Sequence, residues 1–335
     1  MKILIIEVNW LGDVLFSTPA IRALRRKFPE SYISCLIVPR VKEVLENNPH
    51  INELIINDEE GLHKGFFGAL RLAGELSKRR FDLAVFFHRS FTRAMIAYLS
   101  GIPRRVGYRT GKRWFLLTDS VGMPKKDSAH RVDYYLGITR PLDCRVSDRS
   151  YEFFTDGKDE KYVEDFLRKE KVSPDDFTVC LNPGGNWEPK RWPKGNFSQL
   201  ADRLIAEYRA KVIFTGSPND TGIISEITRQ MKYEPISAAG VTNLKQSACL
   251  FKKANLVISG DSGPLHIAAA VGANVIGLFG PTSPSITGPI GKGRIKVIHK
   301  DTGCVVPCYD KDCDNNRCMH KIAVDDVMSE IKNFL

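Results

Sequence analysis

Short apolar runs alternate with amphipathic stretches along this 335-residue chain. In the first half, the pattern predicts buried strands at 3–7, 32–38, 53–56 and 82–87, and helices at 14–28, 41–47, 64–80 and 91–99. In the second half, it predicts strands at 178–181, 211–214, 256–259 and 275–279, and helices at 197–208, 222–232, 244–253 and 264–271. Strands that alternate with helices in this way are typical of doubly wound α/β folds with parallel sheets.

The chain is too long for one typical core, which favours two domains. Around residues 141–160 the composition becomes polar and acidic, and we place the boundary there. The predicted domains are doubly wound, span residues 1–155 and 156–321, and share a cleft at the carboxyl ends of their strands. A last helix at 322–335 is expected to pack back towards the first domain.

The stretch at 254–291 is the most informative part of the chain. No Lys, Arg, Asp or Glu occurs from Ser262 through Gly291, but glycines and prolines interrupt the apolar run, which therefore indicates a soluble core and not a membrane span. A turn at 260–263 leads into a helix that begins near Pro264, and such a helix start favours an anion, above all a phosphate. Asp261 and His266 lie beside it, although helix capping and a buried core histidine explain them equally well.

Asp13 lies where the first predicted strand passes into the first helix. Ligands bind at this carboxyl edge in open α/β sheets, so its carboxylate is either a helix N-cap or a catalytic base. His88 and Arg89 follow another strand at the same kind of edge. They are candidates for binding an acceptor, and a structural role for the histidine is the alternative.

Positive charge is concentrated in the first half of the chain. The net charge is +10, and residues 1–150 contain 25 Lys and Arg against 16 Asp and Glu. At 104–114 basic residues, Arg109 among them, are interleaved with aromatic ones. This pattern is typical of nucleic-acid binding, but no known nucleic-acid-binding module surrounds it, and phosphate on a small or lipid-borne substrate explains it as well. A surplus scattered over solvated helix faces is a further alternative.

Two loops of the second half also follow predicted strands. The loop at 182–193 is rich in backbone donors and contains Lys190 and Arg191, and the turn at 215–220 ends on Asp220. Neither matches a P-loop, and the turn at 9–13 is not G-x-G-x-x-G, which argues against a P-loop NTPase and an ordinary dinucleotide oxidoreductase. We therefore expect the nucleotide in the second half and the acceptor in the first.

Four of the eight cysteines form the series Cys304-x3-Cys308-x4-Cys313-x4-Cys318. The spacing permits a zinc site without specifying one, so reduced thiols, a metal site and disulfides all stay open, with reduced thiols favoured. The first apolar run is too short for a signal peptide, and no segment qualifies as a transmembrane helix. The sequence therefore predicts a cytoplasmic protein, in which thiols stay reduced.

Three separated motifs point to one family. They are W-L-G-D-V-L-F-S-T-P-A-I-R-A-L-R at 10–25, K-R-W-P at 190–193, and G-D-S-G-P-L-H-I-A-A-A at 260–270, followed by L-F-G-P-T-S-P at 278–284. Together they resemble the inverting glycosyltransferases of family 9, the ADP-heptose:lipopolysaccharide heptosyltransferases, and most closely the heptosyltransferase II branch. The resemblance spans nearly the whole chain and includes the cysteines near its end.

The resemblance implies a GT-B fold of two Rossmann-like domains and transfer of a heptose from ADP-L-glycero-D-manno-heptose to the inner core of lipopolysaccharide. It implies Asp13 as catalytic base and a donor site made of Lys190, Asp261, Ser262, Gly263 and His266. The family's ribose-binding carboxylate falls in the turn at 216–220, where this sequence has Pro218, so Asp220 is a substitute for it. His88, Arg89 and Arg109 are the acceptor candidates.

The implied partners are an ADP-sugar, an anionic glycolipid acceptor and the cytoplasmic surface of the inner membrane, with no cofactor, no required metal and no nucleic acid. Two alternatives remain. One is a transferase or epimerase that acts on a different nucleotide sugar. The other is a non-catalytic protein that binds an anion or nucleic acid.

Overall fold

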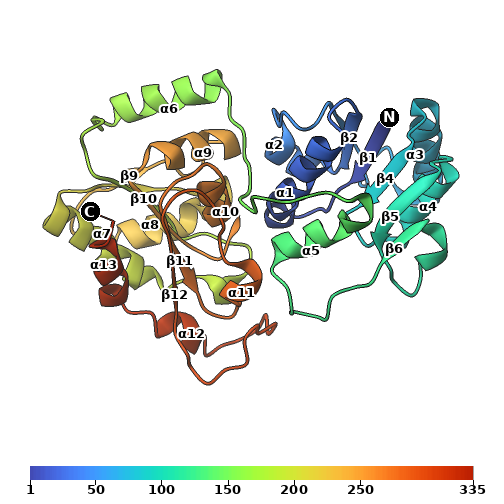
Figure 1. The fold of residues 1–335 in the computed structure, drawn as a ribbon. Helices are drawn as coiled ribbons and strands as arrows, with labels where there is room; N and C mark the ends of the chain where they lie inside the picture. Colours follow the sequence, from blue (N-terminus) through green and yellow to red (C-terminus); the bar gives the residue numbers. More distant parts are fainter. Residues whose placement is uncertain (335) are drawn as a thin grey trace. The chain divides into compact units, whose positions relative to one another are not determined.

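The computed structural model describes residues 1–334. The chain divides after Glu152 into two compact units, of which the structure describes residues 1–152 and 153–334 (Figure 1). The division lies within the polar stretch in which the sequence places the domain boundary.

The first unit is built on a parallel sheet with the strand order β3-β2-β1-β4-β5-β6. This is the order of a dinucleotide-binding Rossmann sheet. Its strands are β1 (Lys2–Ile6), β2 (Tyr32–Ile37), β3 (Glu53–Ile56), β4 (Leu83–Phe86), β5 (Arg104–Tyr108) and β6 (Asp119–Val121).

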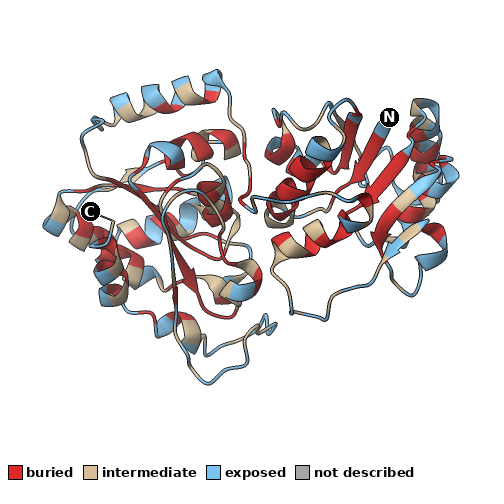
Figure 2. Ribbon diagram, in the orientation of Figure 1, coloured by how far each residue is buried: buried red, intermediate tan, exposed pale blue. Residues whose placement is uncertain are grey.

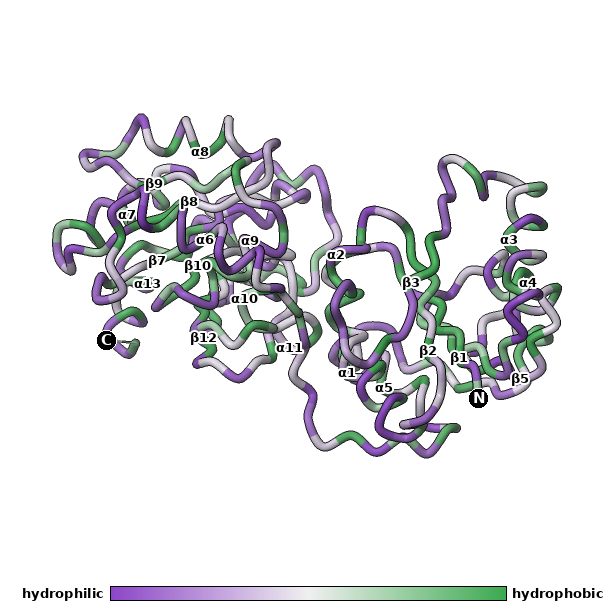
Figure 3. Tube along the Cα trace, turned by 90° about the horizontal axis from the view of Figure 1, so that it is seen from above, coloured by the Kyte–Doolittle hydropathy of each residue, from purple (hydrophilic) through white to green (hydrophobic). Residues whose placement is uncertain are grey.

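Helices cover both faces of this sheet because successive side chains of each strand point to opposite sides. One apolar cluster joins Leu4 and Ile6 of β1 to α3 and α4, and α1 packs with α5. The central strands are buried, and the hydrophobic colouring follows β1 and β2 (Figures 2 and 3). The helices are α1 (Leu11–Lys27), α2 (Lys42–Leu45), α3 (Gly65–Arg79), α4 (Phe91–Leu99) and α5 (Arg131–Ile138), with short 3-10 turns η1 (Pro39–Val41), η2 (Trp114–Leu116) and η3 (Arg140–Leu142).

The second unit repeats the same topology. Its parallel sheet has the order β12-β11-β10-β7-β8-β9, which is the order of the first sheet when the strands are counted from β7. The strands are β7 (Thr178–Asn182), β8 (Lys211–Phe214), β9 (Ile236–Ser237), β10 (Leu256–Gly260), β11 (Val275–Phe279) and β12 (Ile295–His299).

One face of the second sheet packs against α7, α8 and α13, and α9 packs with α6 and α10. The contacts of α13 that the structure gives are with α7 and β12, so its predicted reach towards the first domain stays a prediction. The helices are α6 (Gly157–Lys169), α7 (Lys194–Tyr208), α8 (Thr221–Thr228), α9 (Leu244–Lys253), α10 (Gly263–Ala270), α11 (Pro284–Thr287), α12 (Arg317–His320) and α13 (Val324–Ile331), with 3-10 turns η4 (Glu188–Lys190) and η5 (Pro218–Asp220).

The doubly wound α/β architecture predicted from the alternating pattern is confirmed in both units. One local expectation is wrong. The first helix begins at Leu11 and its N-cap is Trp10, so Asp13 lies within the first helical turn and is not a cap. Capping therefore does not explain why a carboxylate stands at this edge.

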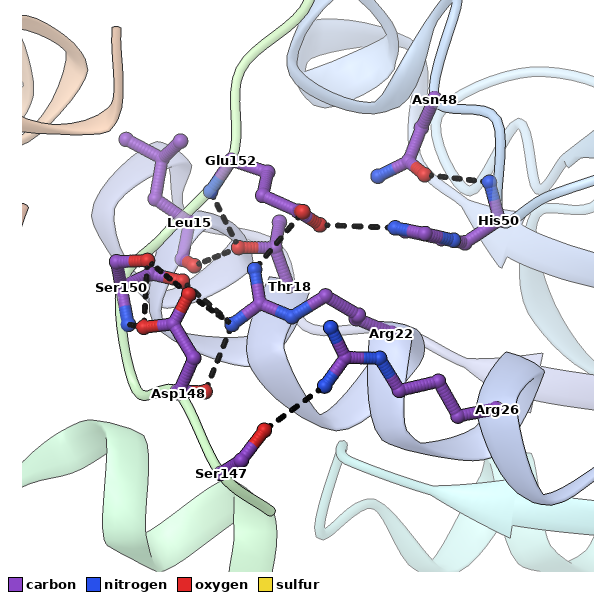
Figure 4. Close-up of polar contacts among 10 residues, drawn as sticks. All are labelled: Leu15, Thr18, Arg22, Arg26, Asn48, His50, Ser147, Asp148, Ser150 and Glu152. Atoms are coloured by element: carbon purple, nitrogen blue, oxygen red, sulfur yellow. Dashed lines mark hydrogen bonds and ion pairs between the residues drawn. The ribbon is translucent and has the colours of Figure 1, made fainter. Parts of the chain in front are cut away.

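The end of the first unit is bound to α1 through the buried guanidinium of Arg22 (Figure 4). Its Nη2 donates to the carbonyl oxygens of Asp148 (2.7 Å) and Ser150 (3.1 Å), and Nη1 pairs with Glu152 Oε1 at 2.8 Å. Oε2 of Glu152 also lies 3.2 Å from His50 Nε2. Burial opposes ionisation of Glu152, but these two partners hold its pKa below its ordinary value. Residues 148–152 are therefore part of the first unit and not a free linker.

Replacing Arg22 should strongly destabilise the first unit. Arg22→Met leaves the Glu152 carboxylate and two carbonyl groups short of a donor, and breaking a buried pair costs about 3–5 kcal/mol. We expect that loss in the free energy of unfolding measured with urea. Arg26→Met is the matched control, because Arg26 lies one turn further on in α1, is exposed and contacts only Ser147 Oγ in Figure 4. It should change stability by less than about 0.5 kcal/mol. Equal effects of the two variants would contradict the role given to Arg22.

Candidate active site

Both sheets reverse their strand order at one point, between β1 and β4 in the first unit and between β7 and β10 in the second. Ligands of open α/β sheets bind beside such a switch point, at the carboxyl ends of the strands. The segments that follow these four strands contain most of the residues singled out from the sequence: Asp13, His88, Arg89, Lys190, Asp261, Ser262, Gly263 and His266.

Asp13 is half-buried in the first turn of α1, directly after the loop that follows β1. Its Oδ1 accepts a hydrogen bond of 2.9 Å from the hydroxyl of Tyr135 on α5. No partner of Oδ2 occurs within residues 1–334, so one oxygen is oriented and the other is left for a ligand. Tyr135 is fully buried. Burial, and to a lesser extent the charge of nearby Asp13, raise the pKa of its phenol well above the ordinary value, so the hydroxyl stays a donor. The sequence offered no signal for Tyr135, which lies 122 positions after Asp13 in the chain.

Glu7 is a second carboxyl group at this edge, and the sequence analysis missed it. It is the residue after β1 and is completely buried. One oxygen, Oε2, accepts from the Val8 amide at 3.0 Å, and the other, Oε1, lies 2.8 Å from Ser17 Oγ. Burial raises the pKa of Glu7 to about 8, against the opposing effects of Ser17, the Val8 amide and Arg93.

The hydrogen bonds of Ser17 agree with a protonated Glu7. Ser17 Oγ has a single hydrogen and also lies 2.8 Å from the carbonyl oxygen of Val14, which can only accept. Both contacts are full hydrogen bonds when Ser17 donates to Val14 and a neutral Glu7 donates to Ser17. At neutral pH a protonated Glu7 therefore places no second negative charge beside Asp13.

The acceptor candidates lie after β4 and β5. His88 is half-buried, its Nδ1 accepts from the Ser90 amide at 3.0 Å, and burial together with Arg93 lowers its pKa to about 4, so its ring is neutral at physiological pH. Arg113 is completely buried and donates to the carbonyl oxygens of His88 and Tyr108, at 2.6 and 2.9 Å. It thereby ties the loop after β5 to the loop after β4. Arg89 and Arg109 are exposed beside these loops.

In the second unit, the buried carboxylate of Asp261 connects three elements. Its Oδ2 accepts from Lys190 Nζ at 2.8 Å and from Thr287 Oγ1 at 3.2 Å, and its Oδ1 lies 3.1 Å from His266 Nε2. Burial opposes the charge, but His266 and Lys190 together hold the pKa of Asp261 well below its ordinary range. Asp261 is thus an ion-paired anchor, and the capping alternative does not describe it, because Ser262 is the N-cap of α10.

Lys190 reaches Asp261 because its backbone packs directly on the end of β10. A Cβ atom at Gly260 would lie 2.9 Å from the carbonyl oxygen of Lys190, so only glycine allows this approach. The ammonium group also lies 5.4 Å from the ring centroid of Trp187. The side chain stays 25% exposed, and two of its three hydrogens are used by Asp261, through Oδ2 and the carbonyl oxygen at 3.2 Å. One donor remains for a ligand.

The other donor candidates lie along the same edge. Ser262 Oγ contacts Ser259 Oγ at 3.1 Å, and Gly263 begins α10. Asp220 caps its own turn through Ser217, at 2.6 Å from the hydroxyl, and lies so close to Gly184 that a Cβ there would be 2.5 Å from its Oδ1. Asp220 therefore adjoins the loop after β7.

Several buried polar atoms of this edge have no hydrogen-bond partner within the described residues. They are Asn182 Oδ1 at the end of β7, Trp187 Nε1 in the following loop and Thr282 Oγ1 after β11. An unsatisfied buried polar atom costs about 1–3 kcal/mol, so three along one edge indicate a place where a polar ligand supplies the missing bonds. The sequence analysis missed these three residues and Thr287, because none has a spacing that singles it out.

The cysteine series lies in the irregular segment between β12 and α12. In the described part of the chain all eight cysteines are free, and no three His, Cys, Asp or Glu side chains are arranged to hold a metal ion. Among helices within residues 1–334, none is both long and apolar enough to cross a bilayer.

The two units are Rossmann-type sheets of equal strand order. The first has an oriented carboxylate at its edge, and the second has an ion pair and buried polar atoms without partners among the described residues. These features are those of a GT-B type α/β transferase. The chain belongs to glycosyltransferase family 9 (heptosyltransferase), whose model matches residues 69–319. It is therefore a glycosyltransferase, as the three sequence motifs predicted.

Similar proteins agree with this assignment. Lipopolysaccharide heptosyltransferase 2 of Salmonella typhimurium is 29% identical over 324 residues, which cover 90% of this chain and 89% of that protein. The Veillonella parvula structure of a family 9 glycosyl transferase has a TM-score of 0.88 at 24% identity and covers 99% of this chain and 96% of its own. The Escherichia coli ADP-heptose LPS heptosyltransferase II structure has a TM-score of 0.81 at 26% identity and covers 100% and 98%.

The raised pKa of Glu7 makes a prediction about stability. Below pH 4.5 the carboxyl group is protonated in both states, but between pH 4.5 and 8 only the unfolded chain loses the proton, so folding becomes less favourable as pH rises. Glu7→Gln keeps a neutral side chain with a donor and an acceptor and removes this penalty. The free energy of unfolding of the variant should exceed that of the wild type by a margin that grows by up to about 4 kcal/mol from pH 5 to 8.

Denaturation with urea at each pH measures that margin. Glu30→Gln, which removes an exposed carboxylate of the same unit, is the control for the loss of charge. A difference between Glu7→Gln and wild type that does not change with pH would mean that Glu7 is ionised in the folded protein.

Proposed function

We propose that this protein transfers a heptose from ADP-L-glycero-D-manno-heptose to the inner core of lipopolysaccharide, with inversion, and that Asp13 is the general base. The observation that carries the proposal is the geometry of Asp13 in a member of this family: Tyr135 orients Oδ1, while Oδ2 has no partner within the described residues. The names of similar proteins, among them lipooligosaccharide heptosyltransferase 2 of Haemophilus influenzae, support the donor sugar and the acceptor class.

The reaction is a single displacement. Asp13 takes the proton from an acceptor hydroxyl as its oxygen attacks the anomeric carbon, and ADP leaves from the opposite face. Tyr135 keeps the carboxylate in position, and neutral Glu7 adds no second charge beside it. The neutral ring of His88, with Arg89 and Arg109, binds the acceptor and its anionic groups.

On the donor side, negative charge grows on the diphosphate as the bond to the sugar breaks. Preorganised donors at that position stabilise the transition state more than the ground state. Lys190 supplies one hydrogen that Asp261 does not use, and the start of α10 at Ser262 and Gly263 supplies the positive end of a helix dipole. His266 holds Asp261 from the far side, and Asp220 receives the ribose hydroxyls.

Asp13→Asn separates catalysis from structure. The amide keeps the size of the side chain and its contact with Tyr135, but it cannot accept the acceptor's proton. We expect kcat to fall by about 10²- to 10⁴-fold while the melting temperature and donor affinity stay close to those of the wild type. Heptose transfer followed with ADP release measures the effect. A variant that keeps most of its rate would rule out Asp13 as the base.

Donor identity is tested by thermal stabilisation with ADP-heptose, other ADP-sugars and UDP-sugars. A ligand at 100 times its dissociation constant adds about 2.7 kcal/mol to stability, so the matching donor should raise the melting temperature clearly. Asp13→Asn should respond equally, because its donor site is intact. We expect transfer to continue with EDTA present, since Lys190 and α10 supply the positive charge. Selective stabilisation by a UDP-sugar would favour the alternative of a different nucleotide sugar.

A further inference from the structure

An exposed aromatic cluster lies beside the acceptor candidates. Phe91 at the start of α4 and Trp114 and Phe115 of η2 are 40%, 53% and 56% exposed. The rings of Phe91 and Phe115 are 6.3 Å apart, and those of Trp114 and Phe115 are 6.1 Å apart. These three rings come from two segments and contact one another, so they form one continuous apolar surface. Apolar surface of this kind on a folded unit marks an interaction site.

The aromatic cluster is surrounded by positive charge. From Arg104 to Lys126 the sequence has seven basic residues and a single acidic one, Asp119, which is already paired with Arg104. The guanidinium of Arg109 lies over the ring of Trp114 at 5.7 Å. Within residues 1–334, neither Arg109 nor Lys112 forms an ion pair. We call the three rings together with Arg89, Arg109 and Lys112 the aromatic–basic surface.

The fold holds these rings outward. Buried Arg113, the residue before Trp114, donates to the backbone of both adjoining loops, and the next residues after the rings, Leu116 and Leu117, are in the core. The backbone that carries Trp114 and Phe115 is therefore held on both sides by buried residues.

The chemistry of this surface fits a lipid bilayer with anionic headgroups. Aromatic side chains settle at the interface between headgroups and acyl chains, and Lys and Arg beside them are attracted to anionic lipids. A nucleic acid fits less well, because single-stranded bases stack on open ring faces. Here the ring planes of Trp114 and Phe115 stand at 87° to each other and contact edge to face. They therefore do not present parallel ring faces on which successive bases could stack.

We infer that the aromatic–basic surface docks the first unit on an anionic phospholipid bilayer, with Phe91, Trp114 and Phe115 entering the interface, Lys112 contacting headgroup phosphates, and Arg89 and Arg109 facing the anionic groups of the membrane surface, those of a lipid-borne acceptor among them. The inference rests on the proposed function only where it connects docking to a lipid-borne acceptor. Docking itself is a property of the surface and is measured without any substrate.

The test is binding of the full-length protein to vesicles of phosphatidylethanolamine with phosphatidylglycerol, and to vesicles of phosphatidylcholine alone, by co-sedimentation. The wild type should bind the anionic vesicles and should lose binding as salt is raised. The double variant Trp114→Ser/Phe115→Ser should bind at least about tenfold more weakly, because two large apolar side chains no longer enter the interface. Both replaced side chains are exposed, so an unchanged melting temperature verifies the fold.

A matched control comes from α3 of the same unit. Phe66 and Phe67 are 72% and 82% exposed and contact each other edge to face, but from Asp58 to Glu75 the sequence has four acidic residues against two basic ones. Phe66→Ser/Phe67→Ser should leave vesicle binding unchanged. Equal losses from the two double variants would overturn the assignment of docking to the aromatic–basic surface. Binding to RNA but not to anionic vesicles, or a loss of self-association in place of vesicle binding, would also overturn it.

Activity separates this inference from the proposed function. Trp114→Ser/Phe115→Ser should slow transfer to an acceptor held in anionic vesicles by about tenfold and leave transfer to the delipidated, water-soluble acceptor unchanged. An equal loss with both acceptors would mean that these rings serve the reaction and not docking. If neither acceptor receives heptose from the wild type, the proposed function fails, and vesicle binding still decides whether the surface docks.

Discussion

A buried carboxyl group must either be paired with cations and hydrogen-bond donors or keep its proton, and the two units of this protein use the two solutions beside the switch points of their sheets. Glu7 follows β1 and Asp261 follows β10, both at the switch point of a sheet. Asp261 is paired with Lys190, His266 and Thr287 and stays ionised, whereas Glu7 accepts from the Val8 amide, lies beside the Ser17 hydroxyl and has its pKa raised to about 8. The ionised Asp261 retains Lys190 at the edge of the second sheet. The protonated Glu7 adds no second negative charge beside Asp13.

The equal strand order of the two sheets explains why the important groups lie where they do. In a parallel sheet all strands end at one edge, so residues far apart in the sequence meet there: Asp13 and Tyr135 in the first unit, Lys190 and Asp261 in the second. The backbone of Lys190 in η4 approaches Gly260 closely, and this brings the lysine side chain within reach of the Asp261 carboxylate. The unsatisfied atoms of Asn182, Trp187 and Thr282 lie along the same edge, as is expected where a ligand completes the hydrogen bonds.

The sequence was sufficient for the central strands and for the position of Asp13, because apolar periodicity and strand-to-helix turns are local signals. It failed at β5, β6, β9 and β12 and at the helices α5 and α6. At β5 and β12, Arg104, Arg105 and Lys296 interrupt the apolar pattern of strands near the edges of their sheets. It also could not decide between cap and base for Asp13, since that depends on where α1 begins and on a hydroxyl from α5. Thr287, the third partner of Asp261, comes from a four-residue helix that has no periodicity to detect. Contacts between distant segments are therefore the part of the site that only the structure supplies.

The ion pair of Lys190 and Asp261 bears on the proposed role of Lys190 as a donor to a diphosphate. Asp261 shares its carboxylate among three partners, because Lys190 and Thr287 contact Oδ2 and His266 contacts Oδ1. A diphosphate that approaches the remaining hydrogen of Lys190 finds a fixed donor beside the positive end of α10 and needs little rearrangement to be bound. In the proposed donor site, the buried carboxylate therefore holds the ammonium group in place for the diphosphate.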